Sequence, residues 1–239
     1  MIGIILAAGR GKRISKAIFE KPKWSIEIKK KMLIEHQITN LENNKIKKII
    51  IIGGYKSNLI PKRYKIIKNF KWNKTNSIFS LMQAKKYLFK NDAIITYSDI
   101  FYSSKIIRKL KKENKKICLP FNTNWKKYWT KRFKNPLDDA ESFRIRKNGK
   151  IIEIGKKAKK AINIQGQFMG IMKLSPLGFK KLYKIYSNLK ITEQMKIDTT
   201  SILQKCIENG INIYGFPTNE LWYEIDNKKD LKIFLKQIN

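Results

Sequence analysis

The first 23 residues constrain this chain most. The apolar run MIGIIL leads directly into a glycine-rich turn, AAGRGKR at residues 7–13, and Pro22-Lys23 follows. The run predicts a buried strand over residues 2–6. The small residues of the turn, which let the backbone approach an anion without an intervening Cβ, are Ala7, Ala8, Gly9 and Gly11. Backbone N–H groups at such a turn favour a small polyanion, most simply a nucleoside triphosphate.

Two cations accompany this turn. The guanidinium of Arg13 can fork onto two phosphate oxygens, whereas Lys23 carries a mobile point charge. The turn is not a P-loop, because no Gly-Lys-Ser/Thr follows the second glycine. It is not a full dinucleotide fingerprint either, because Ile14 stands where a small residue is required. A Gly-x-Gly alone fits an ordinary strand-to-helix turn, but the longer pattern LAAG-x-G-x-R, followed by Pro-Lys, predicts nucleotide binding.

Size and composition indicate one folded domain. Hydrophobic residues make up 42% of the 239, which is enough for a substantial core and excludes a disordered chain. No apolar stretch approaches the ~18–20 residues that cross a bilayer. The N-terminus shows no charged leader or cleavage site, so MIGIIL is interpreted as a strand and not as a signal segment. Cys118 and Cys206 form no C-x-x-C pair, so we expect buried thiols in a reducing cytoplasm.

The net charge of +35 is the most unusual compositional feature. Lysine greatly outnumbers arginine, the lysines are dispersed, and Ile and Asn are in excess as well, which indicates a general composition preference. Runs such as residues 109–112 are interpreted as solvated faces. A basic surface attracts polyanions by long-range steering without specifying any of them. We therefore expect no specific nucleic-acid partner and, at most, weak association with an anionic membrane surface.

Hydrophobic periodicity predicts alternating strands and helices through residue 119. The expected strands are 2–6, 48–52, 64–68, 92–97 and 116–119, and the expected helices are 32–43, 77–88 and 104–113. This rhythm is typical of an α/β fold, here a Rossmann-like, mixed but mostly parallel sheet with helices on both faces. No linker or repeat interrupts the chain, so we expect a single domain over residues 1–239.

The pattern changes after Pro120. A hairpin is predicted at Asn148-Gly149, within a small β-containing insert, and a strand at 168–174 precedes a helix begun by Ser175-Pro176. The remaining expected elements are helices at 198–209 and 228–238, a strand at 211–216 and the strand-like LWYEI. This second half elaborates the same domain.

Two aspartates are candidate metal ligands. Asp99 ends the apolar strand IITYSDI, at the sheet edge where open α/β sheets bind ligands, and its carboxylate needs a partner there. Asp226 arrives much later, in WYEIDNKKDL, and could instead cap the last helix. Two aspartates that meet over triphosphate oxygens would hold Mg²⁺, a hard ion that prefers oxygen ligands. We favour the metal interpretation for both.

Asn76 and Ser77 begin the expected helix over 77–88, as cap residues would. Capping alone accounts for them. The functional alternative is that Asn76 also bonds a base or ribose, because its amide offers a donor and an acceptor that suit a cytosine edge.

The segment PLDDAESF places Asp138, Asp139 and Glu141 together in a very basic chain. These acids form a surface turn or bind the ammonium group of an acceptor. Aromatic residues around them, Trp129 included, could cage a cation, although such rings more often form core. The single histidine, His36, lies within an expected helix and is interpreted as structural.

Together these segments resemble the cytidylyltransferase branch of the sugar-nucleotide pyrophosphorylase and cytidylyltransferase superfamily, including phosphocholine and 2-aminoethylphosphonate cytidylyltransferases. The matching segments are LAAGRGKR, PKW, LIEHQITNL, IIIGGY, NSIFSL, YSDI, PLDDAESF, GQFMGIMKLSP and WYEID. Two departures stand out. Ser98 replaces the glycine usual before the aspartate, and Lys21 replaces the threonine usual before Pro-Lys.

The resemblance implies a nucleotidyltransferase of GT-A-like fold, with a nucleotide-binding half (1–120) and an acceptor-binding half (121–239). It implies that Arg13 steadies the departing pyrophosphate, that Lys23 holds the α-phosphate, and that Asp99 and Asp226 hold Mg²⁺. The implied nucleotide-binding residues are Leu6, Ala7, Ala8, Gly9, Gly11, Gly54, Tyr55, Asn76 and Ser77. The implied acceptor-binding residues are Trp129, Asp138, Asp139, Glu141 and Gln167.

The reaction so implied transfers CMP from CTP to a small phosphorylated or phosphonate acceptor and serves surface polysaccharide, capsule or lipid decoration. The acceptor is open among phosphocholine, 2-aminoethylphosphonate and phosphorylated amino acids such as phosphoglutamine. Two alternatives remain: a sugar-1-phosphate nucleotidyltransferase that uses UTP or dTTP, and a non-catalytic basic RNA- or membrane-binding protein on the same fold. The presence of Arg13, Lys23, Asp99 and Asp226 together disfavours the second.

Overall fold

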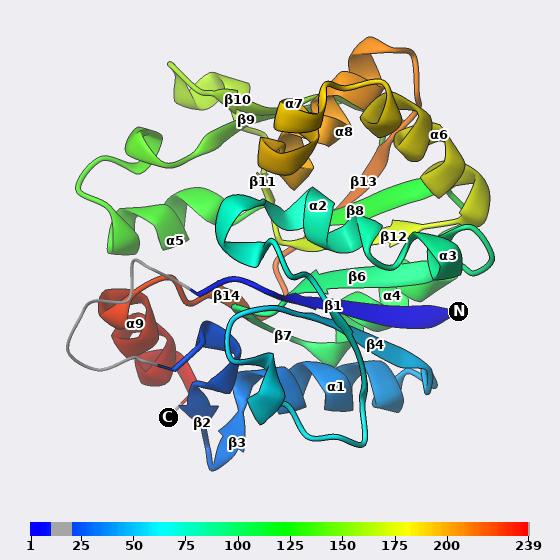
Figure 1. Cartoon of the computed structure of the whole chain (residues 1–239). Helices are drawn as coiled ribbons and strands as arrows, with labels where there is room; N and C mark the ends of the chain where they lie inside the picture. Colours follow the sequence, from blue (N-terminus) through cyan, green and yellow to red (C-terminus); the bar gives the residue numbers. More distant parts are fainter. Residues whose placement is uncertain (11–20, 239) are drawn as a thin grey trace.

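A computed structural model describes residues 1–10 and 21–238 of the chain. Gly11 and Arg13 of the predicted nucleotide site lie outside the described residues. Figure 1 shows a central twisted sheet with helices packed on both of its faces. This is the mixed, mostly parallel α/β architecture that the sequence predicts. Among the described residues, no helix has the length and apolar character needed to span a membrane.

The main sheet is built around the first strand. Its strands are β1 (Ile2–Ala7), β4 (Ile49–Gly53), β5 (Lys65–Lys68), β6 (Ala93–Tyr97), β8 (Ile117–Asn122), β11 (Gln167–Phe168), β12 (Ile171–Leu174) and β13 (Tyr214–Thr218). They run in the order β11-β8-β12-β6-β1-β4-β5, and β13 pairs with β8. Strands β4 and β6 flank β1 in parallel, and β12 runs antiparallel to β6 and β8. The carboxyl ends of β1, β4 and β6 therefore lie at one edge.

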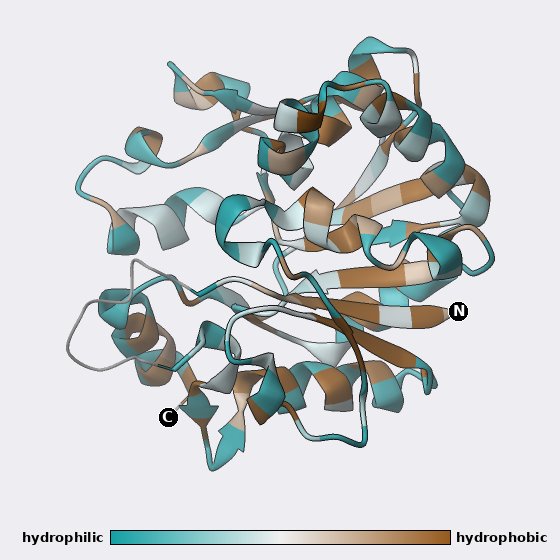
Figure 2. Cartoon of the chain, viewed as in Figure 1, coloured by the Kyte–Doolittle hydropathy of each residue, from teal (hydrophilic) through white to brown (hydrophobic). Residues whose placement is uncertain are grey.

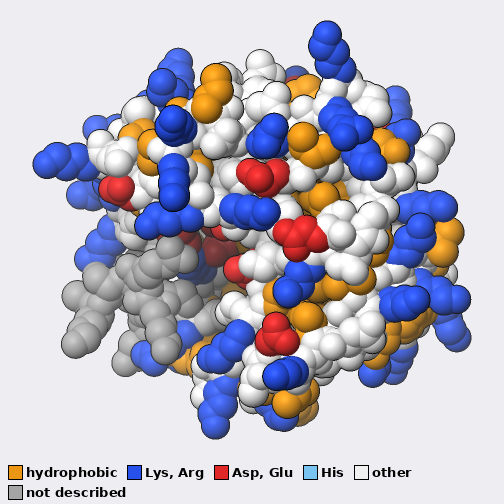
Figure 3. All heavy atoms as spheres, turned by 90° about the horizontal axis from the view of Figure 1, so that it is seen from above, with side chains coloured by type: hydrophobic (Ala, Val, Ile, Leu, Met, Phe, Trp, Pro, Cys, Tyr) orange, Lys and Arg blue, Asp and Glu red, His pale blue; other side chains and the backbone are white. Residues whose placement is uncertain are grey.

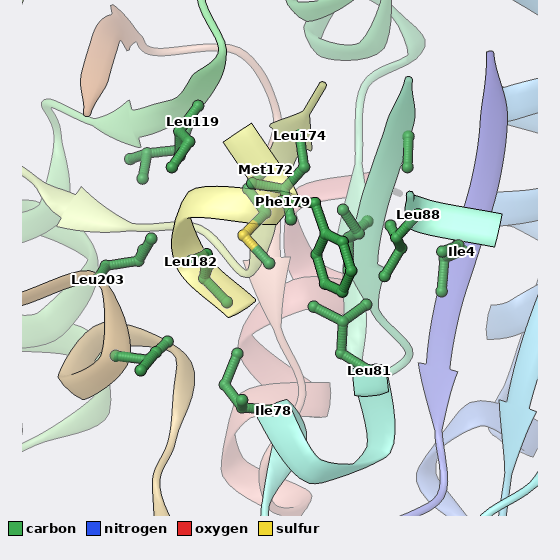
Figure 4. Packing of buried hydrophobic residues seen from close by; sticks show 14 of the residues in the cluster. Ile4, Ile78, Leu81, Leu88, Leu119, Met172, Leu174, Phe179, Leu182 and Leu203 are labelled. Atoms are coloured by element: carbon green, nitrogen blue, oxygen red, sulfur yellow. The ribbon is translucent and has the colours of Figure 1, made fainter. Parts of the chain in front are cut away.

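Helices cover both sheet faces. They are α1 (Leu33–Asn43), α2 (Ser77–Met82), α3 (Lys85–Leu88), α4 (Ser104–Lys112), α5 (Trp125–Arg132), α6 (Pro176–Ser187), α7 (Ile191–Lys196), α8 (Thr199–Glu208) and α9 (Lys228–Ile238). Successive strand residues point to opposite faces. Ile4 lies in one core cluster with residues of α2, α6 and α8, and Ile5 lies in the other with residues of α1, α4 and α5. Figure 4 shows the first cluster, and Figure 2 shows the apolar strands between more polar outer surfaces.

Three two-stranded sheets accompany the main sheet in the described residues. They are β2 (Glu27–Ile28) with β3 (Lys31–Met32), β7 (Ile100–Tyr102) with β14 (Trp222–Glu224), and β9 (Glu141–Ile145) with β10 (Ile151–Lys157). The last pair is the predicted hairpin around Asn148-Gly149, and Gly149 has the left-handed φ of +80° that such a turn requires. The pairing of β7 with β14 is the one that matters for the site, because it connects remote parts of the chain.

Several predicted boundaries change in the structure. The expected helix 77–88 is two short helices, α2 and α3, because a turn at Gln83-Ala84 separates them. The expected strand 168–174 is also two strands. The register against β8 shifts by two residues between them, and Gly170 there has a φ of +69°. A bulge therefore separates β11 from β12. Helix α5 is not predicted at all, because its aromatic and charged residues show weak helical periodicity.

Candidate active site

A cleft of about 480 Å³ lies at the carboxyl ends of β1 and β6. Five predicted nucleotide-binding residues line it: Leu6, Ala8, Gly9, Asn76 and Ser77. Lys23 and Asp99 line it as well. Its size suits a ligand of nucleotide dimensions, and its place is that of ligand sites in open α/β sheets. Ala7, by contrast, is buried.

The turn after β4 fits tightly against the turn after β1. Tyr55 donates its backbone N–H to the carbonyl oxygen of Ala8 at 3.0 Å. A Cβ on Gly54 would lie 2.5 Å from that same oxygen, so glycine is required at this close approach. The Tyr55 ring packs against Trp72, a lining residue of the cleft, with ring centroids 5.3 Å apart. Gly54 and Tyr55 thus support two lining residues of the predicted nucleotide site, Ala8 and Trp72.

Asn76 and Ser77 lie at the start of α2, but the Asn76 side chain makes no capping hydrogen bond. Its amide donates instead to the carbonyl oxygen of Lys196, which ties α2 to α7. The Ser77 hydroxyl lies 3.0 Å from that of Thr199, and the Tyr97 hydroxyl donates to Thr199 at 2.8 Å. The capping interpretation of the Asn76 side chain is therefore wrong. Its contact with a base stays a prediction.

Lys23 bridges the two predicted metal ligands. The residue begins a short 3₁₀ turn (Lys23–Ser25) whose Trp24 is buried in the core, which fixes the turn at the mouth of the cleft. The Lys23 ammonium lies 2.8 Å from Asp99 Oδ2 and also bonds Asp226 Oδ1. Three groups that are remote in the sequence thus meet at one point.

The pairing of β7 with β14 brings the two aspartates together. Asp99 immediately precedes β7, and Glu224 at the end of β14 pairs with Ile100. The pairing continues by one hydrogen bond, in which the Ile225 N–H donates to the Asp99 carbonyl oxygen at 2.8 Å. The next residue, Asp226, is therefore placed beside Asp99.

Arg132, the last residue of α5, binds three carboxylates of the cluster. Its guanidinium donates to Glu224 Oε2 at 3.0 Å, to Asp226 Oδ2 at 3.2 Å and to both oxygens of Asp230 at 3.0 and 3.2 Å. The side chain is 1% exposed. Asp226 is thus held between two cations, with Oδ2 on Arg132 and Oδ1 on Lys23.

These contacts shift the proton affinities of the cluster. Burial by itself would lower the pKa of Lys23, but the charges of Asp99 and Asp226 outweigh it and raise that pKa. The pKa of Arg132 is likewise raised, since the carboxylates outweigh burial. Burial, helped by the charge of Asp226, raises the pKa of Glu224 above that of an ordinary carboxyl group. Both basic side chains therefore stay charged.

The donor set fits a hard divalent cation. Carboxylate oxygens of Asp99, Glu224 and Asp226 lie within 4.8 Å of one another. A positive charge, the Lys23 ammonium, already lies between two of them. The carboxylates of Asp99, Glu224, Asp226 and Asp230 gather around the charges of Lys23 and Arg132. Carboxylate oxygens are ligands that Mg²⁺ prefers.

The residues predicted to bind an acceptor lie elsewhere. As the described residues define the cleft, it is lined by none of Trp129, Asp138, Asp139, Glu141 and Gln167. The Trp129 indole N–H donates to Asp139 Oδ2 at 3.1 Å. The Gln167 side chain is buried and bonds the backbone of Glu141. Burial raises the pKa of Glu141, whose carboxylate accepts from Thr200 at the start of α8. Their role toward an acceptor stays a prediction.

The aromatic residues near the acidic segment do surround a cation, and it is a side chain of the protein. The Arg132 guanidinium carbon lies 5.3 Å from the ring centroids of Tyr128 and Trp129 and 5.1 Å from that of Phe133. Trp129 also stacks on Trp222. Tyr128 and Trp129 are buried, which agrees with the interpretation of these rings as core.

Sequence reasoning missed two groups of site residues. Trp72, Tyr97 and Asp198 line the cleft; Tyr97 belongs to the YSDI segment but was given no role, and no motif marks Trp72 or Asp198. Arg132 was missed because α5 was not predicted. A compositional signal was present, since only seven of the 53 basic residues are arginines. An arginine among aromatic residues in so lysine-rich a chain indicates a site where the planar, forked guanidinium makes contacts that a lysine cannot make. Figure 3 shows basic side chains spread over the viewed face instead of gathered in one patch.

Comparison with known proteins places this chain in a family. The profile described as "MobA-like NTP transferase domain" matches residues 3–129. A protein of Campylobacter jejuni described as CTP:phosphoglutamine cytidylyltransferase is 33% identical over 256 aligned positions, which cover 99% of this chain and all of the relative. The bifunctional protein GlmU of Methanococcus maripaludis is 29% identical over 97% of this chain, which spans 53% of that relative.

Among solved structures, the CTP:phosphocholine cytidylyltransferase of Streptococcus pneumoniae superposes with a TM-score of 0.76. The superposition covers all of this chain and 99% of that one, at 19% sequence identity. This likeness establishes the fold and confirms the expected nucleotidyltransferase architecture.

Proposed function

Since the chain belongs to the family of MobA-like NTP transferase domains, we propose that it transfers CMP from CTP to a small phosphorylated or phosphonate acceptor, with Mg²⁺ and release of pyrophosphate. Membership makes the chain a nucleotidyltransferase, and the non-catalytic alternative is set aside. One observation carries the proposal: Lys23, Asp99 and Asp226 converge at the mouth of a cleft lined by the turn after β1.

The proposed reaction is a direct displacement. An acceptor oxygen forms a bond to the α-phosphorus of CTP, the bond from that phosphorus to the bridging oxygen breaks, and pyrophosphate leaves. The protein contributes positioning and charge neutralisation. Lys23 would neutralise the α-phosphate and the incoming anion. Arg13 would steady the pyrophosphate, as its motif implies.

The metal assignment rests on Asp99 and Asp226, with Glu224 beside them. Mg²⁺ held there would offset charge on the triphosphate oxygens. The turn residues Leu6, Ala8 and Gly9 would present backbone to the nucleotide, and Asn76 would read its base edge. Gly54 keeps the two turns in contact.

The acceptor is proposed to be zwitterionic, with an anionic phosphate or phosphonate and a cationic amine. Support comes from the C. jejuni relative, whose described acceptor is phosphoglutamine and whose match extends through the acceptor half of the chain. Phosphocholine and 2-aminoethylphosphonate belong to the same chemical class. We further propose a cytoplasmic reaction that activates acceptors for surface polysaccharide, capsule or lipid decoration, consistent with two free, buried cysteines.

A second candidate is a sugar-1-phosphate nucleotidyltransferase that uses UTP or dTTP. The match to GlmU over 97% of this chain favours it. The two candidates differ in both substrates, so a single assay separates them.

The test measures pyrophosphate release with CTP, UTP and dTTP, each against a panel of acceptors: phosphoglutamine, phosphocholine, 2-aminoethylphosphonate and glucose 1-phosphate. We expect the largest kcat/KM with CTP and a zwitterionic acceptor, because a site built to bond a base amino group rejects a base that lacks it. Equal kcat/KM for CTP and UTP, or preference for the sugar phosphate, would establish the second candidate instead.

A further inference from the structure

Arg132 holds the metal-facing cluster from the side opposite the cleft. Its guanidinium bonds Asp226 through Oδ2, whereas Asp226 Oδ1 points to the Lys23 ammonium. The same guanidinium bonds Glu224 at 3.0 Å. Two of the three carboxylates that meet within 4.8 Å are thus fixed by one side chain, which is not among the described residues that line the cleft.

We infer that Arg132 is a positioning residue for the divalent-cation site: it fixes Asp226 and Glu224 so that Asp226 Oδ1 faces Asp99. This inference rests on the proposed function, which assigns the metal to these carboxylates. Groups that hold metal ligands in place tune both the orientation and the affinity of a site. Arg132 would act through Asp226, since it is not among the described residues that line the cleft.

The environment of Arg132 fits this role, because every face of the guanidinium is occupied. Asp230, with no exposed side-chain surface, accepts from Nε and from a terminal nitrogen of the guanidinium, in a bidentate pair. The rings of Tyr128, Trp129 and Phe133 lie around the charge. A lysine could not reproduce this, since it has one point charge and no planar fork. These contacts therefore hold the guanidinium in one orientation. Its hydrogen bond to Oδ2 in turn fixes the orientation of the Asp226 carboxylate.

Asp230 also fixes the backbone of Asp226. Its Oδ2 accepts from the backbone N–H of Asp226 at 3.1 Å, in addition to its bond with Arg132. Both the side chain and the backbone of Asp226 are thereby tied to one buried ion pair. That pair joins α5 to α9, two helices that enclose the site from different parts of the chain.

The competing explanation is that the Arg132–Asp230 ion pair only joins α5 to α9. A measurement of metal binding distinguishes this structural role from a positioning role. The experiment titrates Mn²⁺ into nucleotide-free protein and follows free Mn²⁺ by electron paramagnetic resonance. Arg132→Lys keeps the charge and removes the fork, so we expect Mn²⁺ to bind about 10- to 100-fold more weakly while thermal unfolding stays cooperative.

Lys173→Met is the matched control. Lys173 is buried like Arg132, but within the described part of the chain its ammonium bonds only the backbone carbonyl oxygens of Lys111 and Glu113. We expect this variant to lose stability and to keep its Mn²⁺ affinity within about twofold of the parent protein, since it touches no metal ligand.

The double variant Arg132→Met with Asp230→Asn removes one charge of each sign and tests geometry at unchanged net charge. We expect it also to bind Mn²⁺ at least about tenfold more weakly. Parent-like Mn²⁺ affinity in folded Arg132→Lys and in the double variant would overturn the inference. If the parent protein binds Mn²⁺ and the variants do not, the inference stands even where no CTP-dependent turnover is found, and the proposed function alone fails.

Discussion

The ammonium of Lys23 lies 2.8 Å from Asp99 Oδ2, on the side where Asp99 faces Asp226. A cation of the protein itself therefore occupies the space between two carboxylates that would hold a metal. Side-chain exposures of 11% for Lys23 and 21% for Asp99 leave little solvent to screen the pair. A divalent cation that binds there must displace the ammonium, which is then free to meet a phosphate.

Lys23→Met is expected to tighten Mn²⁺ binding in the absence of nucleotide by about tenfold or more, because two like charges roughly 4 Å apart at a partly buried site repel by several kcal/mol. The same variant should lose most of its turnover with CTP. Calorimetry and steady-state kinetics measure the two effects. Lys21→Met, an exposed neighbour, is the control and should change neither. Weaker Mn²⁺ binding by Lys23→Met would show that the ammonium supports the site instead of competing for it.

Asp99→Asn and Asp226→Asn are each expected to lower kcat by at least about 100-fold, because charge that develops on the phosphates would lose its metal. Asp92→Asn is the control. Asp92 precedes β6, at the end of the strand opposite to Asp99. Kinetics at saturating Mg²⁺ check the expectation. A variant with near-normal turnover would exclude its residue from the metal site.

Glu141→Gln is expected to raise the stability of the protein at neutral pH relative to the parent. Burial raises the pKa of Glu141, so the folded state retains this proton more readily than the unfolded state. The protonated Glu141 therefore stabilises the folded state at low pH. This stabilisation is lost as the pH rises above 4.5, the ordinary pKa of the group. Urea denaturation at pH 4 and pH 7 should show a variant-minus-parent difference that grows with pH. A constant difference would contradict this assignment.

Native Cys118 and Cys206 are expected to resist alkylation. Burial raises the pKa of both thiols to about 12, so almost no thiolate forms at pH 8. Iodoacetamide followed by mass spectrometry should label neither cysteine in native protein and both in urea. Rapid labelling of one native thiol would locate a local opening at its strand or helix.

Much of the fold was predictable from local patterns. The runs 2–6, 48–52 and 92–97 are strands because continuous apolar residues must be buried on both sheet faces. Capping pairs such as Ser175-Pro176 placed helix starts correctly, and the Ser175 hydroxyl does accept the Gly178 N–H. Helix α5 escaped prediction because its aromatics pack by tertiary contact and not by a regular apolar stripe.

The sequence by itself determined part of the site, namely the glycine turn, Lys23, Asp99 and Asp226. It placed the glycine turn and Asp99 each at the carboxyl end of a predicted strand, and the carboxyl ends of parallel strands lie at one edge of a sheet. Only the tertiary structure decided how these groups meet. The antiparallel pairing of β7 with β14 puts Asp226 beside Asp99, and α5 brings Arg132 beneath both. Pairing between remote segments depends on the packing and hydrogen bonding of the whole chain. Local hydrophobic periodicity therefore does not predict it.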